Sequence, residues 1–161
     1  MSGKNPLTAA GLLLGIGLGG FFDGILFHQI LQIHNMLSNV YFPNNLVNAE
    51  INMFWDGLFH AFTWIVTLLG IFLLWKALNK KIKQESGMNF LGLLLIGWGL
   101  FNLVEGVIDH LILQIHHVIQ KTTATGHLYS DLVFLLSGLI LCGIGTWMSK
   151  RSKKQVQSDY I

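Results

Sequence analysis

Twelve ionisable side chains lie within or at the ends of apolar stretches of this 161-residue chain. They comprise all seven histidines and five of the eight acidic residues. The set is Asp23, His28, His34, Asp56, His60, Glu105, Asp109, His110, His116, His117, His127 and Asp131. Imidazole and carboxylate without thiolate are typical ligands of zinc, iron, copper(II) or manganese. The single cysteine, Cys142, excludes an intramolecular disulfide and a thiolate metal cage.

No lysine or arginine accompanies these groups inside the apolar stretches. An ionisable side chain at membrane depth costs roughly 2.5–3.5 kcal/mol even on insertion scales. The carboxylates must therefore be protonated, reach water or bind a cation. The five acids would carry a charge of −5, of which two divalent ions would offset −4, and this favours more than one metal ion. We therefore expect a transition-metal site to which all twelve side chains are candidate ligands, with copper, iron and zinc left open.

The composition indicates a membrane protein. The chain is 52% hydrophobic and only 11% charged, with a mean hydropathy of +0.56, whereas soluble domains are roughly 25% charged. This excludes a soluble globular enzyme, a disordered tail and a secreted disulfide scaffold. Four apolar stretches, at about 7–37, 51–76, 89–120 and 127–148, each exceed the ~20 residues that cross a bilayer. The first and third predict helices of roughly 46 Å that tilt or project beyond the membrane.

The basic residues predict the orientation. Nine of the ten lie on one side of the predicted spans, and only Lys121 lies on the other. The nine are Lys4, Lys76, Lys80, Lys81, Lys83, Lys150, Arg151, Lys153 and Lys154. The positive-inside rule then places both termini in the cytoplasm and the loops 38–50 and 121–126 outside. The net charge of +2 and the isoelectric point near 8.8 therefore reflect orientation and lipid contact rather than nucleic-acid binding.

An internal repeat relates the first and third stretches. When Gly15 is aligned with Gly97, ten of the 23 positions from 15 to 37 are identical to their counterparts in the third stretch. His28 then falls on His110, His34 on His116, and Asp23 on Glu105. The second and fourth stretches match more loosely, with Asp56-x-x-x-His60 facing His127-x-x-x-Asp131 in reversed order.

This repeat predicts an all-α membrane protein: a four-helix transmembrane bundle made of two repeated helical hairpins. We expect one domain over 1–161, with repeats at about 7–78 and 89–150. The glycines Gly11, Gly15 and Gly19 recur at every fourth position, which indicates close helix packing. Glycine-rich faces of this kind could also support an oligomer.

Helix geometry predicts that the polar groups lie in one band near the outer surface. At ~1.5 Å per residue, Asp23, Glu105 and His60 lie about 24 Å above the cytoplasmic anchors, and the histidines His34, His116 and His117 reach about 40 Å. The others fall at roughly 27–33 Å. His28 and His110 lie about 140° from the acid of their own repeat, so we expect them to engage a neighbouring helix. For the residues near helix ends, such as His34 and His127, a wet hydrogen-bonding role is the alternative to metal binding.

Three segments resemble a known family. They are GGFFDGILFHQILQIH at 19–34, DGLFHAFTW at 56–64 and FNLVEGVIDH at 101–110. With these motifs the chain resembles the domain-of-unknown-function 2243 family of small four-span bacterial membrane proteins. The resemblance covers nearly the whole chain and implies a bacterial inner-membrane location, but it brings no settled activity. Members often carry a second histidine where this chain has Asn35.

The leading functional hypothesis is a membrane metalloprotein whose site holds one or two ions and opens to the outer face. Such a site would take a small molecule or metal ion from that side, as a metal-dependent oxidoreductase would. The alternative is a protein that binds, transports or delivers transition metals. Transport would require polar steps through the inner half, where the sequence offers only Thr63, Thr67, Ser137 and Thr146. The third hypothesis is a haem electron carrier with His28 and His110 as axial ligands, although five acids in the same band fit haem poorly.

Overall fold

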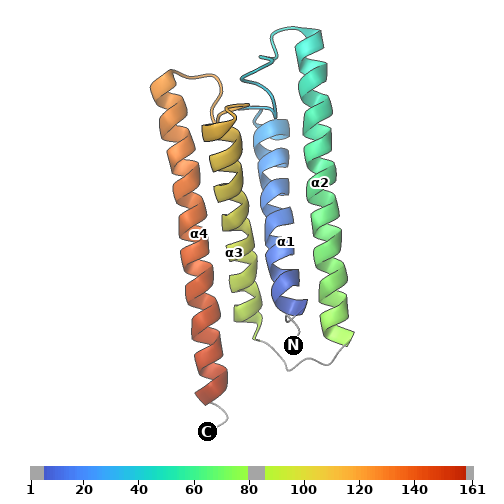
Figure 1. Ribbon diagram of the computed structural model, residues 1–161, viewed down its shortest axis with the longest axis vertical. Helices are drawn as coiled ribbons and strands as arrows, with labels where there is room; N and C mark the ends of the chain where they lie inside the picture. The colour runs from blue at the N-terminus through green and yellow to red at the C-terminus, as the bar shows by residue number, and fades with distance from the viewer. Residues whose placement is uncertain (1–5, 80–85, 159–161) are drawn as a thin grey trace.

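The computed structural model describes residues 6–79 and 86–158, with side chains up to residue 152. Helix α1 (Pro6–Phe22) continues as the π-helix η1 (Asp23–Ile30), and α2 (Leu46–Asn79) returns beside it. Helix α3 (Gly87–Glu105) likewise continues as the π-helix η2 (Gly106–Ile112), followed by α4 (Ala124–Ser158) (Figure 1). The described residues contain no strand. The predicted all-α, four-span architecture of two repeated hairpins is confirmed.

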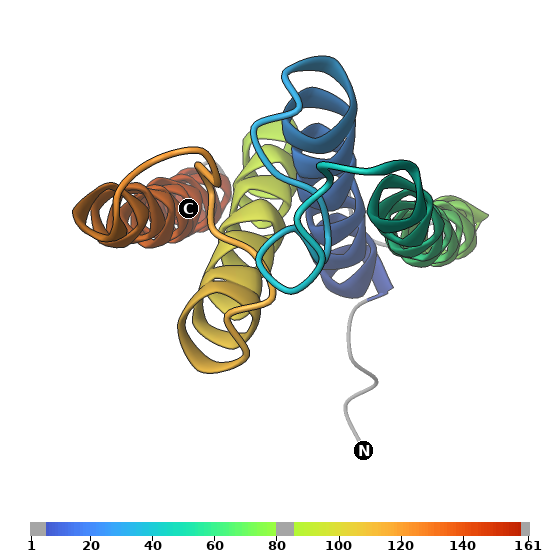
Figure 2. The ribbon, with the colours of Figure 1, turned by 90° about the horizontal axis from the view of Figure 1, so that it is seen from above.

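The helices form a flattened row rather than a square bundle. Helices α1 and α3 cross at the centre, while α2 packs against α1 and α4 packs against α3 (Figure 2). Within the described chain α2 and α4 make no contact with each other. Both outer helices therefore leave most of their surface to the surrounding lipid.

Glycines create the close approach at the centre of the row. A side chain at Gly15 would collide with the carbonyl of Leu94 and lie 2.8 Å from the Cα of Gly97. A side chain at Gly97 would collide with Leu12 and lie 2.9 Å from the Cα of Gly15. Small residues let two helix backbones touch where no hydrophobic force between helices operates. The glycine spacing thus has the packing role that the sequence indicates.

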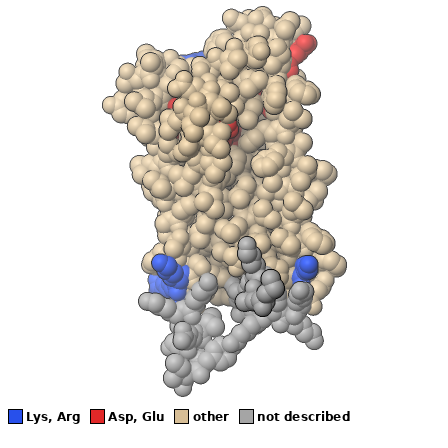
Figure 3. All heavy atoms as spheres, in the orientation of Figure 1, with Lys and Arg blue, Asp and Glu red and all other residues tan. Residues whose placement is uncertain are grey.

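The four helices are long and apolar enough to cross a membrane. The candidate spans are Pro6–Ile30, Leu46–Asn79, Gly87–Ile112 and Ala124–Ser152, with mean hydropathies of 1.8, 2.0, 1.9 and 1.9. In Figure 3 most cations on the visible face gather at one end, and the surface above them is uncharged over much of its length. Lys76, Lys150 and Arg151 belong to the ends of α2 and α4. Among the predicted anchors, Lys4, Lys80, Lys81 and Lys83 and the side chains of Lys153 and Lys154 lie outside the described residues.

The first and third helices end earlier than predicted. The apolar stretches suggested helices to residues 37 and 120, but helical structure stops at Ile30 and Ile112. Two residues later the chain adopts positive φ angles, of 49° at both Gln32 and Gln114, and a helix cannot continue through that conformation. Each chain segment then bends back over its own helix end.

This bend corrects the predicted heights of His34 and His116. A continuous helix would carry them far above His28 and His110. Instead, the rings of His28 and His34 are centred 4.5 Å apart, and those of His110 and His116 are centred 4.7 Å apart. The four imidazoles therefore lie at one level.

The register of the two outer helices also differs from the sequence comparison. A side chain at Gly70 of α2 would meet Leu14, and one at Gly145 of α4 would meet Ile96. Leu14 and Ile96 are equivalent positions of the repeat, so Gly70 and Gly145 are equivalent as well. The offset from Gly70 to Gly145 also leads from Asp56 to Asp131, so the predicted pairing of Asp56 with His127 is wrong. The error arose because the loops 31–45 and 113–123 differ in length.

Candidate metal centre

The π-helices place an acid and a histidine of each repeat on one face. Asp23 and His28 are five residues apart, as are Glu105 and His110. In an α-helix this spacing separates two side chains by about 140°, but a π-helix bonds residue i to i+5 and brings them into line. The carboxylate Oδ2 of Asp23 lies 3.1 Å from Nε2 of His28. His28 contacts Asp56 of the neighbouring helix α2, as expected, and the π-helix adds a contact with its own acid.

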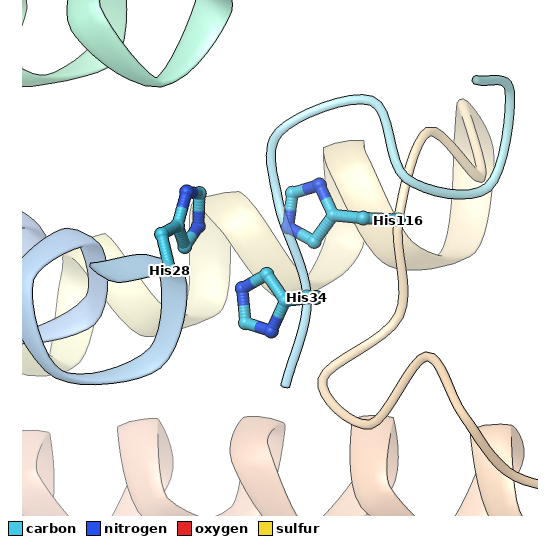
Figure 4. A group of neighbouring side chains, drawn as sticks. All are labelled: His28, His34 and His116. Atoms are coloured by element: carbon cyan, nitrogen blue, oxygen red, sulfur yellow. The ribbon is translucent and has the colours of Figure 1, made fainter. Parts of the chain in front are cut away.

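The two loops hold the next pair of histidines by exchanging hydrogen bonds. The Nδ1 atom of His34 bonds to the carbonyl of Val118 at 2.9 Å, and Nδ1 of His116 bonds to the carbonyl of Met36 at 3.0 Å. A ring nitrogen bonded to a carbonyl must be the donor, so Nε2 of each neutral ring carries the free lone pair. The two rings stack in parallel, 4.7 Å apart at an interplanar angle of 5°. Figure 4 shows His28, His34 and His116 gathered around a common space.

The acids of the two repeats contact these stacked histidines in matching ways. Oδ2 of Asp23 lies 3.8 Å from Nε2 of His34, and Oε1 of Glu105 lies 3.7 Å from Nε2 of His116. Both carboxylates point to the side of the imidazole that carries the lone pair. This orientation suits groups that share a bound cation.

Asp56 of α2 supports the centre from behind. One carboxylate oxygen accepts the backbone N–H of Met36 at 2.8 Å and lies 2.8 Å from Nδ1 of His28. The other oxygen accepts from the amide of Asn35 at 2.9 Å. The carboxylate thus fixes His28 with its Nε2 atom turned toward the centre. Such an outer carboxylate orients a ligating histidine and raises its basicity.

Asp131 of α4 occupies the equivalent place in the second repeat, with a looser contact to its histidine. Its Oδ1 atom accepts the backbone N–H of Val118 at 3.0 Å and lies 3.5 Å from Nδ1 of His110. Its Oδ2 atom bonds to Nδ1 of His117 at 2.7 Å. His117 therefore occupies the place of Asn35 in the first repeat. Both positions hold the supporting carboxylate, so the absence of a second histidine at Asn35 removes no group from the centre.

Seven side chains have buried polar atoms that lack hydrogen-bond partners. One is the half-buried His60, and the other six, each at most 4% exposed, are Asp23, His28, His34, Glu105, His110 and His116. In the described part of the chain, no hydrogen bond of good geometry reaches Oδ2 of Asp23, either carboxylate oxygen of Glu105, either ring nitrogen of His110, or Nε2 of His28, His34 and His116. Oδ2 of Asp23 and Nε2 of His28 approach each other to 3.1 Å. Each such group left unpaired costs about 1–3 kcal/mol.

The orphaned atoms lie close enough to share metal ions. Three overlapping groups have ligand atoms within 4.8 Å of one another: His28 with His34 and His116, Glu105 with His110 and His116, and Asp23 with His28 and Glu105. Burial and the neighbouring imidazoles hold the pKa of His116 well below its ordinary value. His116 is therefore neutral, which is the form of histidine that ligates metals.

Three predicted ligands belong to none of these three ligand groups. His60 packs against Phe21 and Gly24, Asp109 is half-buried, and His127 stacks on His117 at 4.2 Å and contacts the carbonyl of Gln120 at 3.1 Å. Asp56, Asp131 and His117 form the supporting layer. The structure therefore divides the twelve candidates into an inner six, three supporting residues and three outlying ones.

Sequence reasoning missed the polar groups of the loops. The amide of Asn35 and the carbonyls of Met36 and Val118 all position the centre, and Asn52 accepts the backbone N–H of Leu37 at 3.0 Å. The alignment of Asn35 with His117 in the internal repeat was a signal for the role of Asn35. The backbone carbonyls carry no signature in the sequence.

Comparison with known proteins identifies the family of the chain. No curated protein and no solved structure matches the chain. A family model described as a predicted membrane protein, DUF2243, matches residues 10–152. The matched region contains all six inner residues, both supporting aspartates and most of each of the four spans. The chain therefore belongs to the DUF2243 family of predicted membrane proteins.

Proposed function

We propose that this protein is an integral membrane metalloprotein that holds two transition-metal ions in the centre formed by the inner six residues. The observation that carries the proposal is the set of orphaned ligand atoms on six buried side chains within reach of one another. Nδ1 of His28, His34 and His116 has a partner, while Nε2 of the same rings has none. Bonding the outer nitrogen and freeing the inner one is the usual arrangement around a metal-ligating histidine.

Charge supports two ions. The carboxylates of Asp23 and Glu105 line the centre, and those of Asp56 and Asp131 hold its histidines. Together they carry a charge of −4, which two divalent ions balance. The four imidazoles and two carboxylates suit copper, iron or zinc. Two of the three ligand groups combine side chains of both repeats, so the two ions would share ligands between the repeats.

The geometry argues against the haem alternative. A porphyrin between His28 and His110 would need the space that the stacked rings of His34 and His116 occupy. Both rings are held in place by hydrogen bonds to loop carbonyls. A separate metal centre requires no such displacement.

The inner half of the bundle favours a resident centre over a transport path. The hydroxyls of Thr63, Thr67 and Ser137 each bond to a carbonyl of their own helix, at 2.9, 2.8 and 2.6 Å. These bonds hold each hydroxyl against its own helix, and an ion crossing this half would find few other oxygen ligands among the predicted steps. We therefore favour a metal-dependent oxidoreductase over a transporter.

Orientation is part of the proposal. The chain would form one transmembrane domain in a bacterial inner membrane, with both termini in the cytoplasm. The centre lies in the half of the bundle opposite the ends of the described chain (Figure 1), so it would face the periplasm. Labelling from outside of a cysteine in 38–50, but of none in 79–88, is the expected result.

Metal analysis tests the central claim. Protein purified without chelators should contain two transition-metal ions per chain. The double variant Asp23→Asn/Glu105→Gln preserves side-chain shape and should lose most of the metal, because the ligating charge is removed. Glu50→Gln, which alters an exposed acid at the same end, is the matched control and should retain it. Wild-type protein without stoichiometric metal, whose melting is unchanged by added zinc, copper or iron, would contradict the proposal.

A further inference from the structure

Two apolar grooves reach the centre from opposite faces of the flattened row. The first, which we call the Asp23 groove, has a volume of about 730 Å³ and lies among α1, α3 and α4. The second, the Glu105 groove, has a volume of about 620 Å³ and lies among α1, α2 and α3. Both volumes are typical of small-molecule sites, which are mostly apolar with a few convergent polar groups.

The grooves are equivalent under the internal repeat. Six lining positions of one groove recur in the other when Gly15 is aligned with Gly97. The pairs that matter most are Asp23 with Glu105 and Val118 with Met36. Each groove therefore includes one acid of the centre in its lining, beside the loop residue that holds a central histidine. The repetition indicates a specific approach to the centre rather than an accident of packing.

The two grooves differ in shape and charge. The Asp23 groove has Gly19 where the Glu105 groove has the larger Phe101, and it has Phe27 where the other has Asp109. Its wall includes the rings of Phe22 and Trp98, with centroids 5.1 Å apart. The Glu105 groove carries a second carboxylate, that of Asp109, which adds charge to its lining. The Asp23 groove is thus the larger of the two, and apart from Asp23 its polar lining groups, such as Asn102, Ser130 and Ser137, are uncharged.

The end of the molecule formed by the loops 31–45 and 113–123 is more closed than the two grooves. The two loops cross there, with the N–H of Asn39 donating to the carbonyl of Ile115 and the N–H of Gln120 donating to that of Ile33, both at 3.0 Å. A polar cavity of about 280 Å³ that touches His34 remains beside them. This volume is below half that of the Asp23 groove, and its lining includes Lys121.

We propose that the Asp23 groove binds a membrane-dissolved amphiphile with an alkyl chain and a metal-ligating oxygen head group, which enters the centre sideways from the bilayer. The proposal rests on the proposed metal function. The apolar wall suits the chain, and the unpartnered Oδ2 of Asp23 would accept a hydrogen bond from the head-group hydroxyl. The oxygen of the head group would then complete the coordination of the nearer ion.

Other occupants satisfy the site less well. A phospholipid acyl chain in the groove would place hydrocarbon against the carboxylate of Asp23. A second copy of the chain would present mainly apolar side chains, because the exposed faces of α2 and α4 are rich in large hydrophobic residues. Neither supplies a donor to Asp23 or a ligand to a metal ion. The amphiphile is the occupant that matches both ends of the groove.

The test uses two hydroxamic acids that share the same head group and differ in the length of the alkyl chain. Wild-type protein in phosphatidylcholine nanodiscs is loaded with cobalt(II), whose visible absorption reports changes in ligation. Decanehydroxamic acid should shift the spectrum saturably, with half-saturation at a concentration at least tenfold lower than that of water-soluble acetohydroxamic acid. Cobalt content is measured in parallel, so that loss of metal, which would refute the proposed function, is separated from loss of ligand binding.

Matched variants locate the binding site and control for simple partition into lipid. Val133→Phe/Ile140→Phe fills the Asp23 groove, and Leu58→Phe/Leu100→Phe fills the Glu105 groove, at four positions exposed to lipid. The first double variant should weaken the response to decanehydroxamic acid at least tenfold while keeping its cobalt, and the second should change it less than threefold. Equal potency of the two acids, an unaltered response in both variants, or loss in the second variant with or without the first would overturn the proposal.

A metal-independent readout completes the experiment. Trp98 lines the Asp23 groove, so a protein in which Trp55, Trp64, Trp75 and Trp147 are replaced by phenylalanine reports on it alone. A brominated decyl alcohol should quench this fluorescence saturably, and the matched bromodecane should quench it only in proportion to its membrane concentration. Identical quenching by both compounds would show that the groove holds hydrocarbon without recognising the head group, which contradicts the proposal.

Discussion

The repeat formed by α1, η1 and α2 and the repeat formed by α3, η2 and α4 contribute equivalent residues to the centre but different ones to its surroundings. Both supply an acid, two histidines and a supporting aspartate. The contacts of the acids with the stacked histidines and of the aspartates with the loop backbone have matching lengths. Outside this set the repeats diverge. Asn35 and Phe27 of the first repeat align with His117 and Asp109 of the second. With the offset that relates Gly70 to Gly145, His60 aligns with Leu135.

The comparison separates residues that form the centre from residues that surround it. Where both repeats direct an unpartnered histidine or carboxylate atom inward, we expect that atom to be a metal ligand. Where the two repeats carry different side chains, we expect metal binding to tolerate either of them. On this basis we expect metal binding to survive the loss of His60, Asp109 or His127, although each has a ligand-type side chain.

The largest effect should come from separating the two repeats. Gly15→Val would drive a side chain into the backbone of α3 at Leu94. Overpacking costs about 1–3 kcal/mol in adaptable cores, and more is expected here because a backbone carbonyl cannot rotate away. Both halves of the centre should lose metal together, as measured by metal content and thermal melting. Gly143→Val, where nothing lies within 4 Å of the added group, is the control. Retention of full metal content in Gly15→Val would show that the halves act independently.

Removal of one stacked histidine should have the next largest effect. His34→Ala and His116→Ala each delete one inner ligand and should lower metal affinity more than tenfold. Binding to the folded state adds about 2.7 kcal/mol of stability at a ligand concentration 100 times the dissociation constant, so melting temperatures should fall further in metal-loaded than in metal-free samples. The two variants should agree within threefold if the repeats are equivalent. His127→Ala should match wild type, and metal loss in that variant would break the distinction between inner and outer residues.

A smaller effect is expected from the supporting aspartates. Asp56→Asn and Asp131→Asn keep the shape of the side chain but weaken the hold on His28 and His110. Changes in such outer partners typically lower metal affinity 10- to 100-fold. Competition with a chelating dye gives the affinity of each variant. Asp109→Asn is the control and should change affinity less than threefold. An effect in Asp56→Asn alone would mean that only the first repeat holds metal.

The smallest effect should come from converting one repeat toward the other. Asn35→His introduces the group that bonds to Asp131 in the second repeat, so metal affinity should change less than threefold. Asn35→Leu removes the amide donor from Asp56 without replacement and should cost about 1–3 kcal/mol of stability. Chemical denaturation of the two variants side by side provides the comparison. Equal destabilisation by histidine and leucine would show that the two positions are not equivalent.

Several features could be predicted from the sequence because they follow from composition and local spacing. Four long apolar stretches can be satisfied only as membrane-spanning helices, since every backbone polar group must be paired within lipid. Alignment of the first stretch with the third identified the equivalence of His28 with His110 and of His34 with His116. The glycine spacing of the first stretch indicated the close crossing with the third.

The composition of the centre was decided by contacts that are distant in the chain. His34 bonds to a carbonyl 84 residues away and His116 to one 80 residues away, and these bonds turn Nε2 of each ring inward. The π-helical turns place an acid and a histidine five residues apart on one face, where α-helical angles put them far apart. Sequence periodicity assumes one uniform helix and local neighbours. Which six of twelve candidates form the centre depends on the helix turning early and on two loops locking across the repeat, so only the tertiary structure could select them.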